Sequence, residues 1–314
     1  MFSRFIGIDY SGAETADSSL KGLQIASVMH DSSVRLVPPP AGPKKYWTRE
    51  AIAHWLVETL SDGPPAIVGI DHGFSFPLAY FTKYKLERSW LTFLEDFCRH
   101  WPTDRPHMYV DFARDDQRKG KVPERSGSSK WRRLTEICTG SAKSVFHFDV
   151  QGSVAKSTHA GLPWLRHVRE TVRRPVHIWP FDGWAIPPDR SAIVEVYPRR
   201  WRLPVPTPHG MTEHELDAHI IAHTLCNADV DGRLERWLAP VMPDEVRAVA
   251  EVEGWILSAD PARLPQLALS LVGKGASAKA ERRRLSLSAY LSGFFGMTRR
   301  SNREVTGRGA HTRY

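Results

Sequence analysis

Four acidic residues lie in sequence surroundings where an isolated charge is costly. Asp9 and Asp71 each end a short apolar run that is typical of a buried strand. Glu195 stands alone among apolar neighbours, and Asp217 falls in the second turn of a predicted helix. A buried carboxylate is destabilising unless it is paired or bound to a cation. If the strands are neighbours, the four side chains converge on one cleft and form a candidate active site.

The chemistry that suits such a cluster is metal-dependent hydrolysis. Clustered carboxylates repel one another unless a cation neutralises them. Mg²⁺ and Mn²⁺ prefer oxygen ligands, and two such ions about 4 Å apart can stabilise the attacking and leaving oxygens at a phosphodiester. We therefore expect Asp9, Asp71, Glu195 and Asp217 to bind two divalent cations. Each residue taken singly is equally well explained as a turn cap or a paired carboxylate, and only their combined placement favours a site.

A histidine accompanies the last of these carboxylates. His214 lies three residues before Asp217, so the two project from about the same helix face. An imidazole there can support a metal-bound carboxylate, and we include His214 among the candidate catalytic residues. An exposed first-turn histidine is an equally good explanation, because His219 and His223 occur on the same predicted helix.

A sheet and a C-terminal helix are needed to position these residues. Apolar and alternating patterns predict strands over residues 4–9, 22–29, 34–38, 66–71, 176–179 and 193–198. Helices are predicted from Thr48 to about residue 62, over residues 89–100, from Thr212, and from Pro243 to about residue 253. Thr212 and Glu215 have the spacing of a capping box, which explains Glu215 without a role in the site.

This order of elements predicts an α/β fold with the RNase H topology. It combines a three-stranded antiparallel meander with further parallel strands, and helices cover both faces. We expect one RNase-H-like domain over residues 1–262, with an insertion at about residues 78–175, and a basic tail over residues 263–314. Inside the insertion, residues 114–133 are polar and basic and predict a mobile loop.

Charge and composition limit the classes of function. The chain has 314 residues and a net charge of +8, and its three cysteines lack the spacing of a metal or redox pair. Residues 274–314 contain ten Lys/Arg and two Asp/Glu, so this stretch alone carries +8 and favours nucleic acid as a partner. No apolar run reaches the roughly 20 residues of a membrane helix, and the start does not look like a secretory signal. We therefore expect a cytoplasmic protein without membrane contacts.

Five short motifs resemble a known bacterial family. They are Gly7-Ile8-Asp9-Tyr10-Ser11-Gly12, Gly69-Ile70-Asp71-His72-Gly73-Phe74-Ser75-Phe76-Pro77, Glu195-Val196-Tyr197-Pro198, Asp217-Ala218-His219 and Glu253-Gly254-Trp255-Ile256. In this order and spacing they are similar to the family called domain of unknown function 429, described as predicted RNase-H-like nucleases. The His214 to Asp217 spacing also resembles the last helix of RuvC resolvases. Residues 78–175 contribute none of the motifs.

The resemblance implies a role for each acidic residue. Asp9 would bridge both metal ions, Asp71 and Asp217 would each complete the shell of one ion, and Glu195 would bind or orient water. The nuclease activity that the resemblance implies is an analogy at the level of the fold, because the same superfold also includes kinases and inactive adaptors.

Three functions remain open on the sequence. The leading hypothesis is a metal-dependent nuclease acting on DNA or RNA, with the 114–133 loop and the tail holding phosphates and aromatic side chains stacking on bases. A non-catalytic nucleic-acid adaptor is the first alternative. The second is an actin-like small-molecule kinase, which needs a second such domain with a glycine-rich nucleotide motif that the sequence lacks.

Overall fold

The computed structural model describes residues 2–115, 122–202 and 210–264. The chain divides into two compact units, residues 1–261 and 262–314. Nearly all of the second unit, and with it the stretch expected to form a basic tail, lies outside the described residues.

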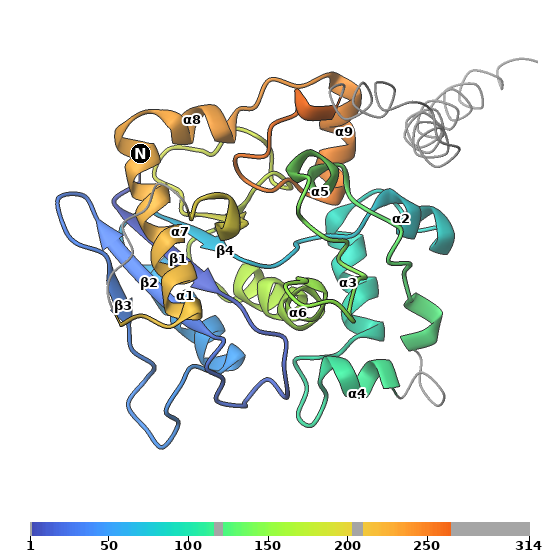
Figure 1. Ribbon diagram of the computed structural model, residues 1–314, viewed down its shortest axis with the longest axis horizontal. Helices are drawn as coiled ribbons and strands as arrows, with labels where there is room; N and C mark the ends of the chain where they lie inside the picture. Colours follow the sequence, from blue (N-terminus) through green and yellow to red (C-terminus); the bar gives the residue numbers. More distant parts are fainter. Residues whose placement is uncertain (1, 116–121, 203–209, 265–314) are drawn as a thin grey trace, which may run out of the picture. The chain divides into compact units, whose positions relative to one another are not determined.

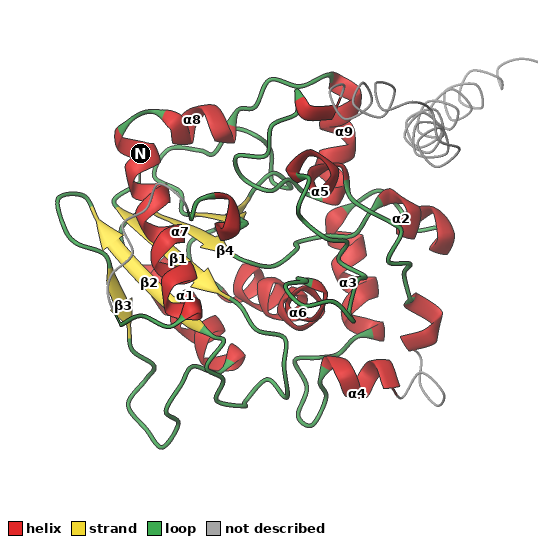
Figure 2. Ribbon diagram, in the orientation of Figure 1, coloured by secondary structure: helices red, strands yellow, loops and turns green. Residues whose placement is uncertain are grey.

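The first unit contains a six-stranded mixed sheet (Figures 1 and 2). Its strands are β1 (Arg4–Asp9), β2 (Gln24–Met29), β3 (Arg35–Val37), β4 (Ala66–Ile70), β5 (His177–Ile178) and β6 (Ala192–Glu195). Their order across the sheet is β3-β2-β1-β4-β6-β5. The first three strands form an antiparallel meander, and β4, β6 and β5 run parallel to β1. This is the RNase-H-like topology, so the predicted α/β fold class is confirmed.

Helices occupy the segments between and after the strands. They are α1 (Arg49–Asp62), α2 (Leu78–Tyr84), α3 (Trp90–His100), α4 (Val110–Asp115), α5 (Leu134–Thr139), α6 (Ala155–Thr171), α7 (Glu213–Val230), α8 (Arg233–Leu238) and α9 (Asp244–Glu253), with short 3₁₀ turns η2 (Val122–Arg125) and η3 (Pro198–Arg200). The segment from α2 to α6 lies between β4 and β5, where the insertion was expected. In the described part of the chain, every helix is too short or too polar to cross a membrane.

Two glycines let α7 lie directly on the central strands (Figure 1). A Cβ atom at Gly7 of β1 would lie 2.2 Å from the carbonyl oxygen of Ala218 on α7. At Gly69 of β4 it would lie 2.6 Å from a methyl carbon of Ile221. Since α1 and α6 together enclose Ile70 from the opposite face, helices cover both faces of the sheet, as predicted.

Local sequence explains where α1 and α7 begin. The hydroxyl of Thr48 accepts a hydrogen bond from the amide of Ala51 at 3.0 Å, which caps α1. At α7, the amide of Thr212 donates to the Glu215 carboxylate at 2.8 Å, and the amide of Glu215 donates back to the Thr212 hydroxyl at 3.3 Å. The predicted capping box is therefore confirmed, and it fixes the place of the first turn of α7.

The long helix α6 is one that the sequence did not predict, because Gly161 and Pro163 both disfavour a helix interior. The structure gives a reason for each. A Cβ atom at residue 161 would lie 2.6 Å from the imidazole of His72. Pro163 has no N–H to donate to the carbonyl of His159, and the hydroxyl of Thr103 donates to that oxygen instead, at 2.6 Å.

A buried glutamate joins the segment between β4 and β5 to α9. Glu253, the last residue of α9, accepts the amide hydrogens of Leu78 and Leu134 at 2.6 and 2.7 Å. These amides open α2 and α5, where N–H groups without an intrahelical partner favour a carboxylate. The Glu253-Gly254-Trp255-Ile256 motif therefore has a structural explanation.

Candidate active site

Asp9 and Asp71 lie side by side at the carboxyl ends of two adjacent parallel strands. Ile8 of β1 pairs with Ile70 of β4, and the amide of Asp71 donates to the Ile8 carbonyl at 3.0 Å. Side chains alternate along a strand, so an aspartate two positions after a glycine that faces α7 also points toward α7. Both aspartates follow such a glycine, and the repeated Gly-Ile-Asp pattern thus places two carboxylates beneath one helix.

α7 contributes two more of the predicted residues. His214 lies in its first turn, with Nδ1 2.6 Å from Oδ2 of Asp9. Asp217 follows one turn later, with 16% of its side chain exposed. Burial raises the pKa of Asp9, and the nearby charge of Asp217 raises it further, while the hydrogen bond from His214 lowers it.

Asp71 is the least compensated of these carboxylates. Its Oδ1 atom is buried and has no hydrogen-bond partner among the described residues. Burial raises the pKa of Asp71 well above its ordinary value, and the charges of Asp9 and Asp217 add to that rise, whereas the charge of Arg202 opposes it. A cation is the partner that would stabilise a carboxylate with a buried, unpartnered oxygen beside two other carboxylates.

Two cationic side chains balance part of this negative charge. Arg202 donates from Nε and Nη2 to the two carboxylate oxygens of Asp217, at 3.0 and 2.8 Å. The hydrogen bond to Asp9 raises the pKa of His214 and favours its protonated form. Arg202 was not predicted as part of the site, because nothing in the sequence marks one arginine among several as the partner of a carboxylate in the next helix.

Glu195 makes its contacts elsewhere. It pairs in register with Ile70, so its side chain points to the face opposite α7. Arg133 donates to its two oxygens at 2.7 and 2.6 Å, and also to Glu136 at 2.9 Å. The side chains of Arg133 and Glu195 are 0% and 3% exposed. Glu195 was expected to lie beside the aspartates, but its side chain binds Arg133 on the opposite face of the sheet. Its charge still raises the pKa of Asp71.

The oxygens of the aspartates suit a divalent cation of the Mg²⁺ or Mn²⁺ type. The unpartnered Oδ1 atom of Asp71 fits such an ion, and Asp9 and Asp217 would complete the donor set once Arg202 releases Asp217. Across the described ranges, no three His, Cys, Asp or Glu side chains already have the arrangement of a metal site. In this structure Arg202 and His214 supply the positive charge.

Several arginines that were expected to hold phosphates bind carboxylates. In the 114–133 segment, Arg114 pairs with Asp149 at 2.8 Å, and Arg125 pairs with Asp96 at 2.6 Å. Apart from the end of α4 and the turn η2, the described part of this segment is irregular, as expected. Residues 116–121 and the tail lie outside the described residues, so their predicted contacts with nucleic acid stay predictions.

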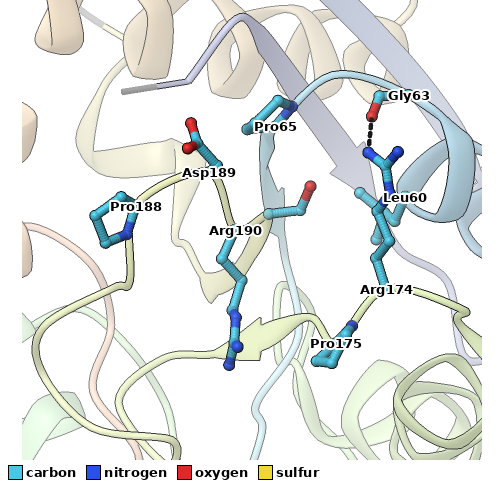
Figure 3. A pocket seen from close by; sticks show the side chains of 9 residues that line it. Leu60, Gly63, Pro65, Arg174, Pro175, Pro188, Asp189 and Arg190 are labelled. Atoms are coloured by element: carbon cyan, nitrogen blue, oxygen red, sulfur yellow. Dashed lines mark hydrogen bonds between the residues drawn. The ribbon is translucent and has the colours of Figure 1, made fainter.

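A hollow of about 220 Å³ lies at the other end of the parallel strands (Figure 3). It is lined by Pro65 and Ser191, which directly precede β4 and β6. Arg174 and Arg190 also line it, but Figure 3 shows their guanidinium groups pointing apart. Because Asp71 follows the opposite end of β4, this hollow is not part of the candidate active site.

Comparison with known proteins supplies no relative for this chain. No family model, no curated protein and no solved structure matches it. The functional proposal therefore rests on the topology and on the contacts of the candidate active site.

Proposed function

We propose that this chain is a metal-dependent nuclease that hydrolyses phosphodiester bonds in DNA or RNA, as in the predicted RNase-H-like nucleases that its motifs resemble. The observation that carries the proposal is the meeting of Asp9 and Asp71 beneath α7, with the Oδ1 atom of Asp71 buried and unpaired. A site of this kind, on strands of this topology, is suited to an ion that contacts a phosphate.

Each residue then has a defined task. Asp9, Asp71 and Asp217 would hold one or two Mg²⁺ or Mn²⁺ ions, which supply charge stabilisation to the phosphate and lower the pKa of bound water. Asp9 also fixes the imidazole of His214 through Nδ1, which leaves Nε2 as the atom that can accept or return a proton. The ion pair with Arg133 occupies both oxygens of Glu195 and anchors the end of β6.

A non-catalytic nucleic-acid adaptor is the second candidate. The observation that favours it is the pairing of Asp217 with Arg202 and of Asp9 with His214, which balances two charges without any metal ion. The kinase alternative has no comparable support, because the described residues form a single mixed sheet and a kinase of this superfold has two such domains.

The two candidates differ in one assay. Wild-type protein is incubated with single-stranded and duplex DNA and RNA in Mg²⁺, in Mn²⁺ and in chelator, beside Asp9→Asn, Asp71→Asn and Asp217→Asn. We expect cation-dependent cleavage by the wild type and a loss of about 100-fold or more in each variant, because removing one charge-stabilising group costs several kcal/mol in the transition state. Asp231→Asn, at the exposed C-terminal end of α7, is the matched control and keeps full activity.

Two results would contradict the proposal. Binding without cleavage in any cation supports the adaptor. Cleavage that is equal in the wild type and the three variants places the chemistry outside these aspartates.

A further inference from the structure

Arg202 is a permanently charged residue in direct contact with the candidate active site. It contacts both oxygens of Asp217, and its Nη1 atom lies 3.9 Å from a carboxylate oxygen of Glu213. Its charge also lowers the pKa of Asp71, although no described contact joins the side chains of Arg202 and Asp71. A single guanidinium thus acts on the same carboxylates that would bind a divalent cation.

The ion pair of Arg202 with Asp217 is of a kind that can exchange. The two side chains are 39% and 16% exposed, so water reaches the pair. Ion pairs that water reaches contribute little to stability. By contrast, the side chains of Arg133 and Glu195 are 0% and 3% exposed, and separating such a buried pair would leave two uncompensated charges away from water. Among the described ion pairs near these strand ends, the one between Arg133 and Glu195 is therefore shielded from water, whereas the one between Arg202 and Asp217 is open to exchange.

When Asp217 is released, the guanidinium of Arg202 loses its bidentate carboxylate partner and can bind another anion. A guanidinium stays protonated throughout the ordinary pH range and cannot become neutral. Its two parallel N–H donors match a phosphate as well as they match a carboxylate. A nucleic-acid substrate would bring a phosphate to this place.

We propose that Arg202 exchanges partners at the candidate active site: it competes with the divalent cation for Asp217 and, once released, binds a backbone phosphate of the nucleic acid. This inference rests on the proposed function and deepens it. Arg202 is then a substrate-binding residue that reaches its phosphate only when the cation is present, so binding of the cation and binding of the strand favour each other.

Two binding measurements on the full chain test the exchange. The first is the affinity for Mn²⁺ alone, by isothermal titration calorimetry. The second is the affinity for a short oligothymidylate with Ca²⁺ present, by fluorescence anisotropy, with the strand checked for integrity afterwards. The variants are Arg202→Gln and Arg202→Lys. Arg169→Gln is the matched control, because Arg169 also makes a bidentate ion pair, from Nη1 and Nη2 to the two oxygens of Asp182 at 2.6 and 2.7 Å, and neither residue belongs to the candidate active site.

The expected results have opposite signs. Arg202→Gln binds Mn²⁺ about two- to fivefold more tightly, since the cation no longer displaces an ion pair. The same variant binds oligothymidylate about five- to tenfold more weakly. Arg202→Lys, which keeps the charge, lies between the wild type and the Gln variant in both assays, and Arg169→Gln matches the wild type.

The outcomes separate the inference from the function on which it rests. Mn²⁺ affinity that is equal in the wild type and Arg202→Gln overturns the exchange and leaves the metal site standing. An unchanged affinity for oligothymidylate overturns the phosphate role. If no variant binds Mn²⁺ at all, the proposed function fails and the exchange fails with it.

Discussion

The two Gly-Ile-Asp segments carry the candidate active site at the level of single residues. In each, the glycine allows α7 to approach the strand, and the aspartate two positions later points toward that helix. The cost is electrostatic, because Asp9 and Asp71 are crowded together and burial raises the pKa of both. The repulsion between these carboxylates in the free protein is what a bound cation would relieve.

The raised pKa of Asp71 predicts how stability changes with pH. The folded state holds the Asp71 proton more tightly than the unfolded state, whose pKa is near 3.8. The stabilising contribution is therefore complete below pH 3.8 and is lost as the pH rises through the higher folded-state pKa. In metal-free buffer at neutral pH, Asp71→Asn should raise the melting temperature by about 2–4 °C, as expected for ~1 kcal/mol in a domain of this size.

Thermal unfolding followed by circular dichroism checks this prediction. The gain should shrink as the pH falls toward 4, because wild-type Asp71 then becomes neutral as well. Asp231→Asn, at an exposed position, should show no such gain. A lower melting temperature of Asp71→Asn at neutral pH would mean that Asp71 is already compensated in the free protein.

At the level of elements, buried glutamates tie α9 and the segment between β4 and β5 to the sheet. Glu253 accepts the opening amides of α2 and α5, and burial raises its pKa to about 8. Arg133 connects Glu136 of α5 to Glu195 of β6. These contacts attach helices of the segment between β4 and β5 to α9 and to β6. Since β6 pairs with β4, they also support the end of β4 that carries Asp71.

Replacing Glu253 by glutamine should loosen this connection. Above about pH 8 the wild-type carboxylate is ionised and accepts both amides, whereas a glutamine offers one acceptor oxygen and one NH₂ group, so the amide of Leu78 or that of Leu134 would face a donor. We expect Glu253→Gln to lower the free energy of unfolding by about 2–4 kcal/mol at about pH 9, measured by urea denaturation. Glu245→Gln, at an exposed position of the same helix, is the control, and equal midpoints for the two variants would show that Glu253 has no such role.

Short-range signals made most of the sheet and its main helices predictable. The strands that carry Asp9 and Asp71 and the capping box of Thr212 with Glu215 all depend on residues within a few positions of one another. α6 could not be predicted in this way, since Pro163 is tolerated only because a threonine 56 residues before His159 satisfies the carbonyl that the proline cannot. The same holds for Glu195, whose partner lies 62 residues earlier in the chain.

For the whole molecule, the net positive charge is concentrated in residues 274–314. The net charge of +8 is matched by that of residues 274–314 alone, so the remainder of the chain is neutral overall. Described arginines near the middle of the chain, such as Arg125 and Arg133, bind carboxylates. Long-range attraction of a polyanion therefore depends mainly on residues that follow the RNase-H-like sheet in sequence.

Deleting residues 274–314 should weaken binding of DNA and RNA and reduce its dependence on salt, because fewer counterions are released from the nucleic acid. The slope of log affinity against log salt concentration, from fluorescence anisotropy, measures this directly. Replacing Arg282, Arg283 and Arg284 by glutamine in the full chain should give an intermediate slope. A slope that the deletion leaves unchanged would exclude these residues from binding.

The central claim is that Asp9 and Asp71 form a binding site for a catalytic divalent cation. The most direct measurement is a crystal of the wild-type protein soaked in Mn²⁺, with anomalous diffraction used to locate the ion. We predict an anomalous peak in contact with carboxylate oxygens of Asp9 and Asp71, absent from crystals of Asp71→Asn. The claim would be contradicted by a soaked crystal whose map has no anomalous peak at this place and in which Asp217 still pairs with Arg202 and Asp9 with His214.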